Sequence, residues 1–396
     1  MAGRIIWTVV FALLWVGCTS ETSNPDTGTT EPVAPGRLVV LDESGNVVVM
    51  DPDGSSRSAI TEDAGPESAA YAQPVWSPDS SKLTWGQVTA AGFAVGVHDV
   101  AGGDTTVVPT DNLPFYMYWS PSGESIGVLH NGSTGVVFRM VDVDTGSSER
   151  LDEDAPFYFT WGPESDRVIT HAGVERVDSV EVDGARESLV PTGPEYLAPQ
   201  WTERGVFHVA NGELIVEHED DGSRVPVADV SGFTNFVANR TGDLIALQSS
   251  ERGGAIEVAL AAVPPIDAGD LVVLDLASSE VFPVTENPAA GFFWSPDGQA
   301  LAVFVIGDDG LTPLIWSRDE VKEFPSFRPT TTMVRDVLPF FPQYAQSVQF
   351  WSPGSTAFAF AGEIDDVSGV WVQEISQSKP TRVSDGVWVA WSGPGG

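Results

Sequence analysis

Three histidines are spaced in a way that could bind a metal ion. His130, His171 and His208 each stand near the end of an apolar, strand-like run that follows a tryptophan. Imidazole nitrogens are good ligands for zinc and other divalent metals, and three on neighbouring strands suffice for a catalytic site. The histidines follow their tryptophans by 11, 10 and 7 residues, so their side chains need not point the same way. Two interpretations stay open, a metal site in a central channel and three hydrogen-bonded core histidines.

A second candidate is the stretch from Pro325 to Gln346, which matches no other part of the chain. It contains two arginines and three aromatic residues that could bind an acidic or sugar-like ligand: Arg328, Arg335, Phe340, Phe341 and Tyr344. Loops on a rigid scaffold commonly carry binding functions. The apolar spacing around Met333 is also that of one or two helical turns that would cover the edge of a sheet. Binding and covering are therefore both open for this segment.

A possible nucleophile occurs in Gly123-Glu124-Ser125-Ile126-Gly127, which matches the Gly-x-Ser-x-Gly pattern of serine hydrolases. That pattern works only where the serine stands on a sharp turn between a strand and a helix. Here the serine enters a strand-like run with no helical pattern after it. The match is therefore interpreted as accidental, and we predict no catalytic residue.

The elements that position these residues are defined by a repeated tryptophan. Short turns such as Trp-Ser-Pro-Asp-Gly follow the tryptophan, and an apolar run comes next, at a period of about 40 residues that is typical of a repeat protein. Serine, proline and glycine at these positions favour a type I turn. Each repeat is therefore expected to be a small antiparallel sheet, with the tryptophans packed between sheets: Trp76, Trp119, Trp161, Trp201, Trp294, Trp351 and Trp391.

One repeat has lost its tryptophan. The gap between Trp201 and Trp294 is of double length, and the segment from Ala238 to Gly242 occupies the place of a turn within it. The last repeat, at Trp391, ends with the chain, and its missing strand is found at Arg37–Leu41. We therefore predict eight blades closed by pairing of the N- and C-terminal strands, with seven blades as the alternative. A ring closed in this way leaves no exposed sheet edges.

These repeats resemble those of the TolB-type, WD40-like propellers, whose signature is Trp-Ser-Pro-Asp-Gly before a strand. The resemblance covers residues 37–396 and implies an all-β propeller of four-stranded antiparallel blades. It implies much less about function, because propellers of this type include periplasmic adaptors, lids of serine peptidases and surface lipoproteins.

The first 36 residues indicate where the protein works. An uncharged apolar run from Ile5 to Val16 has the length of a signal-peptide core. Cys18, the one cysteine of the chain, follows Gly17 as in a bacterial lipobox, which predicts a signal peptide over 1–17 and a lipid on Cys18. The alternative is an ordinary secretory signal with an incidental cysteine. Residues 18–36 are rich in Ser, Thr, Pro and Gly and are predicted to be a disordered tether to a propeller over 37–396.

Charge excludes one class of partner. Lys and Arg together number 19 against 56 Asp and Glu, which gives a formal net charge of −37. Binding to nucleic acid requires a basic surface that this composition does not favour. The sequence therefore predicts a monomeric, lipid-anchored binding or scaffolding module outside the cytoplasmic membrane of a bacterium, without a cofactor, whose partner is an envelope protein or glycan. The alternative is a metal-dependent hydrolase or lactonase-like propeller with a divalent metal in the channel.

Overall fold

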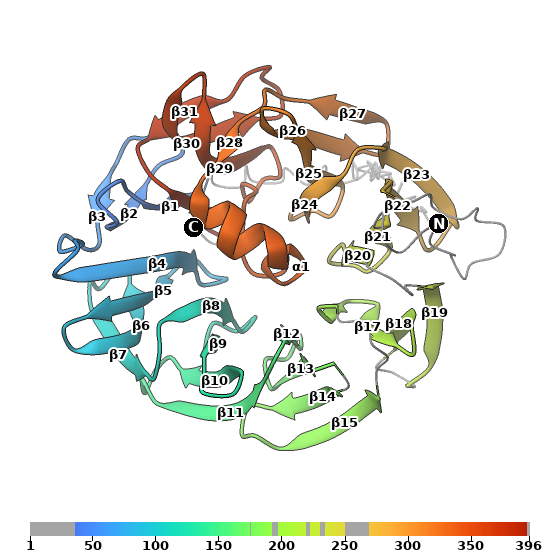
Figure 1. Ribbon diagram of the computed structural model, residues 1–396, viewed down its shortest axis with the longest axis horizontal. Helices are drawn as coiled ribbons and strands as arrows, with labels where there is room; N and C mark the ends of the chain where they lie inside the picture. The colour runs from blue at the N-terminus through green and yellow to red at the C-terminus, as the bar shows by residue number, and fades with distance from the viewer. Residues whose placement is uncertain are drawn as a thin grey trace, which may run out of the picture. The chain divides into compact units, whose positions relative to one another are not determined.

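The computed structural model describes residues 36–174, 176–191, 197–218, 222–229, 234–249 and 269–393. Eight four-stranded antiparallel sheets are arranged as blades around a central channel (Figure 1). The eight-bladed prediction is thus confirmed, and the seven-bladed alternative is wrong. Cys18 and the predicted signal peptide lie outside the described residues, as does the predicted tether up to residue 35.

The blades follow one another in chain order, and each runs outward from the channel. Blades 1 to 8 have these innermost strands: β4 (Ala69–Trp76), β8 (Pro114–Trp119), β12 (Phe157–Trp161), β16 (Gln200–Thr202), β20 (Thr234–Ala238), β24 (Ala289–Trp294), β28 (Arg328–Pro329) and β32 (Trp388–Trp391). The second strands, in the same order, are β5 (Lys82–Thr89), β9 (Ser125–Asn131), β13 (Arg167–Ala172), β17 (Gly205–Ala210), β21 (Leu244–Ser249), β25 (Ala300–Gly307), β29 (Ala357–Ile364) and β1 (Leu38–Leu41).

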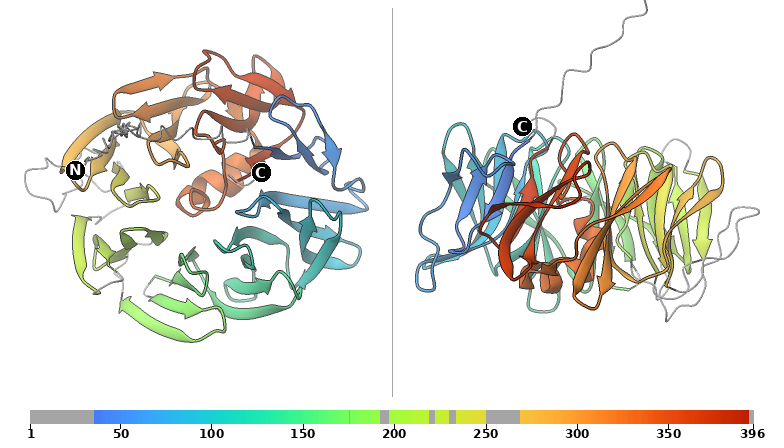
Figure 2. Two further views of the ribbon diagram at one scale, coloured as in Figure 1. Left: turned by 180° about the vertical axis from the view of Figure 1, so that it is seen from behind. Right: turned by 90° about the horizontal axis from the view of Figure 1, so that it is seen from above.

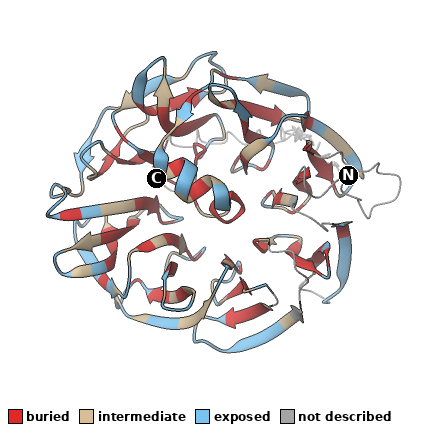
Figure 3. Ribbon diagram, in the orientation of Figure 1, coloured by how far each residue is buried: buried red, intermediate tan, exposed pale blue. Residues whose placement is uncertain are grey.

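Two further strands complete each blade. The third strands are β6 (Gly92–Asp99), β10 (Val136–Asp142), β14 (Arg176–Glu181), β18 (Glu213–Glu217), β22 (Leu271–Asp275), β26 (Gly310–Ser317), β30 (Val367–Glu374) and β2 (Val47–Met50). The outermost strands are β7 (Thr105–Thr110), β11 (Ser148–Asp154), β15 (Arg186–Pro191), β19 (Arg224–Asp229), β23 (Glu280–Thr285), β27 (Glu320–Glu323), β31 (Thr381–Ser384) and β3 (Ser58–Ala59). Burial decreases toward the outer strands (Figure 3).

The last blade joins the two ends of the propeller. β1 pairs antiparallel with β32, so that Leu38 lies opposite Trp391 and Leu41 lies opposite Trp388. The predicted closure between the N- and C-terminal strands is confirmed. Blade 8 contains strands from both ends of the propeller chain. Its innermost strand β32 is therefore paired with β1 and is not left unpaired.

The turn after each innermost strand is held by its own residues. In blade 6 the Ser295 hydroxyl donates to Asp297 Oδ1 at 2.6 Å and accepts the Ala300 amide at 2.9 Å. Gly298 closes the turn with a φ of 68°. Blade 5 keeps this geometry without a tryptophan, because Gly242 has a φ of 74° and Asn239 accepts the Leu244 amide at 3.2 Å. Ala238 is therefore a blade start, as the sequence predicts.

The segment that matches no repeat is inserted in the innermost strand of blade 7. It forms a π turn (Met333–Val337), a 3-10 turn (Leu338–Phe340) and the short helix α1 (Phe341–Tyr344). Figure 2 shows this orange helical segment at one face of the propeller. The expected helical turns are therefore present, and they lie across one end of the channel (Figure 1).

Buried side chains hold the insertion in place. The Gln343 amide donates to the Phe159 carbonyl at 2.7 Å and to Tyr116 Oη at 2.8 Å, and it accepts the Phe159 amide at 2.8 Å. Tyr344 Oη donates to the Phe115 carbonyl at 2.9 Å and lies 2.9 Å from Gln73 Oε1. These contacts reach blades 1, 2 and 3, so the insertion closes one end of the channel by bonding across it.

We predict that Trp351→Ala lowers the free energy of unfolding by about 3–5 kcal/mol, as expected for removal of a large buried ring. The side chain is 2% exposed, and its indole N–H donates to the Phe293 carbonyl of the preceding blade at 3.0 Å. Denaturant unfolding of both proteins at neutral pH measures the difference.

The control for this substitution is Phe340→Ala, since Phe340 is 47% exposed on the insertion. It should change the free energy of unfolding by no more than about 0.5 kcal/mol. Equal effects of the two substitutions would contradict a packing role for Trp351.

Candidate functional site

A cavity of about 730 Å³ occupies the channel at the end opposite the helical insertion. Its wall is made by the ends of innermost strands and by the turns that follow them, and residues 345–350 contribute from the insertion side. We call this end of the channel the mouth. Six of the seven repeat tryptophans line it: Trp76, Trp119, Trp201, Trp294, Trp351 and Trp391.

The mouth contains few charged groups although the protein is strongly acidic. Arg240 and Asp297 are the two charged residues among those described that line the cavity. Arg240 lies at the rim with a side chain that is 74% exposed, and it pairs with Glu203. Most of the lining is aromatic, amide or hydroxyl, which suits binding of a ligand better than acid–base chemistry.

The insertion residues chosen from the sequence are divided between the surface and the core. Phe341 and Tyr344 are each 3% exposed, and burial raises the pKa of the Tyr344 phenol. Phe341 packs against Phe292 with ring centroids 4.7 Å apart. These two residues are therefore part of the contact that closes the channel.

The other three insertion residues are exposed. Arg328 Nη1 lies 2.8 Å from Glu363 Oε1, and Arg335 Nε lies 2.6 Å from Asp336 Oδ1. Phe340 is 47% exposed. The structure therefore does not bring the five side chains together around one ligand, and none of them lines the mouth.

The three histidines lie on β9, β13 and β17, which are the second strands of blades 2, 3 and 4. The sequence placed them on strands facing the axis, but the innermost strand precedes each repeat tryptophan, so the strand after the turn lies one step outward. All three side chains are at most 1% exposed. Within the described residues, no group of three or more His, Cys, Asp or Glu side chains is arranged to hold a metal ion.

Each of these histidines has a partner on the protein. His130 Nδ1 donates to the Asn131 carbonyl at 2.9 Å, and His171 Nδ1 donates to the Leu197 carbonyl at 2.9 Å. His208 Nε2 lies 3.2 Å from Glu217 Oε2. Burial lowers the pKa of His208 and lowers that of His171 to about 4. His171 and His208 are thus kept neutral at physiological pH.

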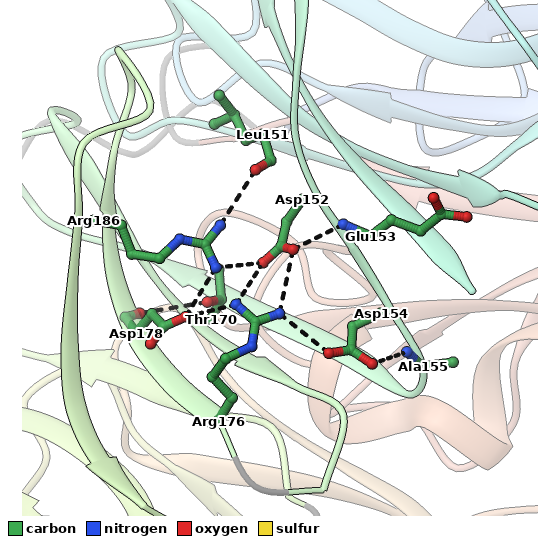
Figure 4. A network of polar contacts seen from close by, with 9 residues as sticks. All are labelled: Leu151, Asp152, Glu153, Asp154, Ala155, Thr170, Arg176, Asp178 and Arg186. Carbon is green, nitrogen blue, oxygen red and sulfur yellow. Dashed lines mark hydrogen bonds and ion pairs between the residues drawn. The ribbon is translucent and has the colours of Figure 1, made fainter. Parts of the chain in front are cut away.

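A cluster of carboxylates and guanidinium groups joins blades 2 and 3 near their outer strands (Figure 4). Arg176 lies 2.7 Å from Asp178 and 3.0 Å from Asp152, and Arg186 lies 2.9 Å and 2.8 Å from the same two carboxylates. Although burial opposes the shift, the two arginines lower the pKa of Asp152. Both carboxylates are therefore paired with the two arginines, so the cluster joins two blades and its acidic groups are already engaged within the protein.

Sequence reasoning missed the residues that separate the two ends of the channel. Gln343 makes three hydrogen bonds to Tyr116 and Phe159, yet a glutamine in an unrepeated segment has no distinctive signal. The rim residues Arg240 and Asp297 were also missed, although both belong to turns at blade starts. Turn position alone could have identified them.

No protein-family model and no curated protein sequence matches the chain. Among solved structures, it is similar to the dihydro-heme d1 dehydrogenase NirN, with a TM-score of 0.58, 14% identity and coverage of 92% of this chain and 76% of NirN. An oligogalacturonate lyase in complex with manganese gives a TM-score of 0.51 and 11% identity, with coverage of 87% and 99% respectively.

TolB from Acinetobacter baumannii is also similar, with a TM-score of 0.40, 15% identity and coverage of 72% of this chain. The chain spans 61% of the length of TolB. At these identities the similarities show a shared β-propeller fold and nothing finer. The predicted architecture, a propeller of four-stranded antiparallel blades, is confirmed by the eight sheets of the structure. Within the described residues no helix has the length and apolar character to cross a membrane.

The buried His171 predicts a loss of stability in mild acid. Its pKa is about 4 in the folded chain and ~6.5 when unfolded, so between these values the unfolded chain binds a proton that the folded chain does not. The stabilisation is complete above pH 6.5 and falls as the pH falls. At pH 5 the loss should be about 2 kcal/mol of unfolding free energy.

Denaturant unfolding of wild type and His171→Gln at pH 7 and pH 5 tests this expectation. The variant should lose less stability between the two pH values, by about 2 kcal/mol. The control is His218→Gln, a partly exposed histidine that bonds the Arg204 carbonyl, and it should behave as wild type does. An identical pH dependence in His171→Gln and wild type would refute the assignment.

Proposed function

We propose that the chain is a non-enzymatic binding propeller, held by a lipid on Cys18 outside the cytoplasmic membrane, that binds an envelope partner at the mouth. The observation that carries the proposal is the cavity of about 730 Å³, closed at one end by the insertion and lined by aromatic and neutral polar groups. A one-ended cavity of this size can bury part of a ligand. The two charged residues of its described lining are too few for acid–base catalysis.

The start of the propeller supports an orientation of the mouth. The Arg37 amide donates to Ser392 Oγ at 2.9 Å, and Gly36 lies against Pro353, which lines the cavity. The chain therefore enters the propeller beside the mouth. Residues 19–36 could span at most roughly 60 Å when extended, so a lipid on Cys18 would keep the mouth within reach of the membrane surface.

The charge of the chain supports a particular set of partners. With 56 acidic against 19 basic residues, association with nucleic acid or anionic lipid headgroups is disfavoured. An envelope protein or a glycan fits the neutral, aromatic mouth. The acidic remainder of the surface keeps the protein soluble and would attract a partner with basic surroundings.

Site-specific photo-crosslinking tests where the partner binds. A photoreactive amino acid replaces Gln299, which is exposed in the turn beside Asp297 at the mouth, and crosslinking is performed in cells of the source bacterium. We expect one dominant crosslinked species from this position, because Asp297 of the same turn lines the cavity.

The control position is Val334, which is 51% exposed on the insertion at the opposite end of the channel. It should give little of the same species, and Cys18→Ser should move the chain from the membrane to the soluble fraction. Stronger crosslinking from Val334 than from Gln299 would show that the other face binds. Membrane retention of Cys18→Ser would remove the lipid anchor from the proposal.

Metal analysis separates the binding module from the metal-dependent alternative. The protein from Thr19 onward, purified without a metal-affinity tag, should carry no stoichiometric metal, and its melting temperature should be the same with and without chelator. Stoichiometric zinc, manganese or calcium together with a chelator-sensitive melt would overturn the non-enzymatic assignment and direct the search toward hydrolase substrates.

A further inference from the structure

The mouth contains one position where the repeat lacks its indole ring. Ala238 ends the innermost strand of blade 5, where the other seven blades have a tryptophan. The backbone around it keeps the repeat geometry, since the Gly242 amide donates to the Asn239 carbonyl at 2.9 Å as the Gly298 amide does to Ser295 at 2.8 Å. Blade 5 therefore differs from its neighbours mainly in the missing ring.

The direction expected for the missing ring follows from the blades whose indole N–H is bonded, which include blades 3 and 6. The indole N–H of Trp161 donates to the Tyr118 carbonyl at 3.0 Å, and that of Trp294 donates to the Val237 carbonyl at 2.9 Å. In each case the ring leans over the residue before the repeat position of the preceding blade. An indole at position 238 would accordingly lean over blade 4, beside Trp201.

The seven repeat tryptophans differ in exposure according to whether their blade is next to blade 5, which lacks the ring. The side chains of Trp76, Trp119, Trp161, Trp351 and Trp391 are between 2% and 8% exposed. Trp201 and Trp294 are partly exposed, and they are the two tryptophans in the blades that flank Ala238. All three residues line the cavity. The two repeat tryptophans that are partly exposed thus flank the position without a ring, and we call the space bordered by Trp201, Ala238 and Trp294 the slot.

The two side-chain amides near the slot are already bonded within the protein. The Gln200 side chain donates to the Phe236 carbonyl at 2.9 Å and accepts the Ala238 amide at 2.8 Å. Asn239 Nδ2 donates to the Gly298 carbonyl at 3.3 Å. What the slot offers is therefore mainly indole surface, which favours a flat apolar ring over a sugar whose hydroxyls need hydrogen-bond partners.

The rim beside the slot can hold the rest of such a ligand. Arg240 follows Ala238 by two residues, and Asp297 follows Trp294 by three; both line the cavity and are exposed. A polypeptide whose aromatic side chain enters the slot would place its backbone near these two charges, which can bind its polar groups.

We propose that the slot binds an aromatic side chain of a partner protein, which takes the place of the indole ring that blade 5 lacks. This inference rests on the proposed function, because the slot opens into the same mouth. It specifies the partner further, as a protein that presents a tryptophan, tyrosine or phenylalanine.

The test uses N-acetyl-tryptophanamide as the probe, with binding to the purified propeller measured by saturation-transfer NMR. A single side-chain analogue should bind wild type with a dissociation constant on the order of 1 mM. Ala238→Trp fills the slot from within and should weaken binding at least tenfold. Ala238→Gly leaves the slot open and should retain wild-type affinity within about twofold.

Thermal melting shows whether each variant is folded. If Ala238→Trp does not fold, Ala238→Phe supplies a smaller ring for the same position and should also weaken binding. Equal binding of the probe by wild type and a folded filled-slot variant would overturn the inference. Saturation of methyl glucoside with loss of that signal in Ala238→Trp would overturn it too, in favour of a glycan.

Failure of this inference can be told apart from failure of the proposed function. If the probe does not bind wild type while the crosslink from Gln299 persists, the mouth binds a partner without an aromatic anchor. If the probe binds in the slot but the Gln299 position captures nothing, the slot exists and the proposed partner site is wrong.

Discussion

The antiparallel pairing of β1 with β32 is the interaction on which the rest of the structure depends. A blade cannot bury both of its faces alone, so each must pack between two neighbours, and only closure provides a neighbour for every blade. The four residue pairs from Leu38–Trp391 to Leu41–Trp388 give that closure. The channel, its width and the placement of the tryptophans around it all follow from the closure of eight blades into a ring.

Closure alone would leave a channel open at both ends. The insertion in blade 7 removes this symmetry, because Gln343 and Tyr344 bond to residues of blades 1, 2 and 3 at one end. Binding at the remaining end can then bury a ligand on several sides. The propeller therefore has one face built from regular turns around a cavity and another sealed by an irregular segment.

Sequence reasoning was accurate for features that depend on local chemistry. The turns bounded by Ser295 and Gly298 are specified by residues a few positions apart, so their recurrence predicted eight blades and the blade start at Ala238. The insertion was harder, because no repeat defines where Phe341 or Tyr344 points. Both are buried, and the histidines proposed for the channel lie one strand further out and bond to nearby groups.

By itself, then, the sequence predicted eight blades, with seven as the alternative, together with their closure and the position that lacks a tryptophan, because these predictions rest on short-range turn chemistry and on a count of repeats. Only the tertiary structure decided that the insertion closes one end of the channel and that Trp201 and Trp294 are the two repeat tryptophans left partly exposed. Those outcomes depend on contacts between residues tens to hundreds of positions apart, whose distance and direction are set by the closed ring of blades.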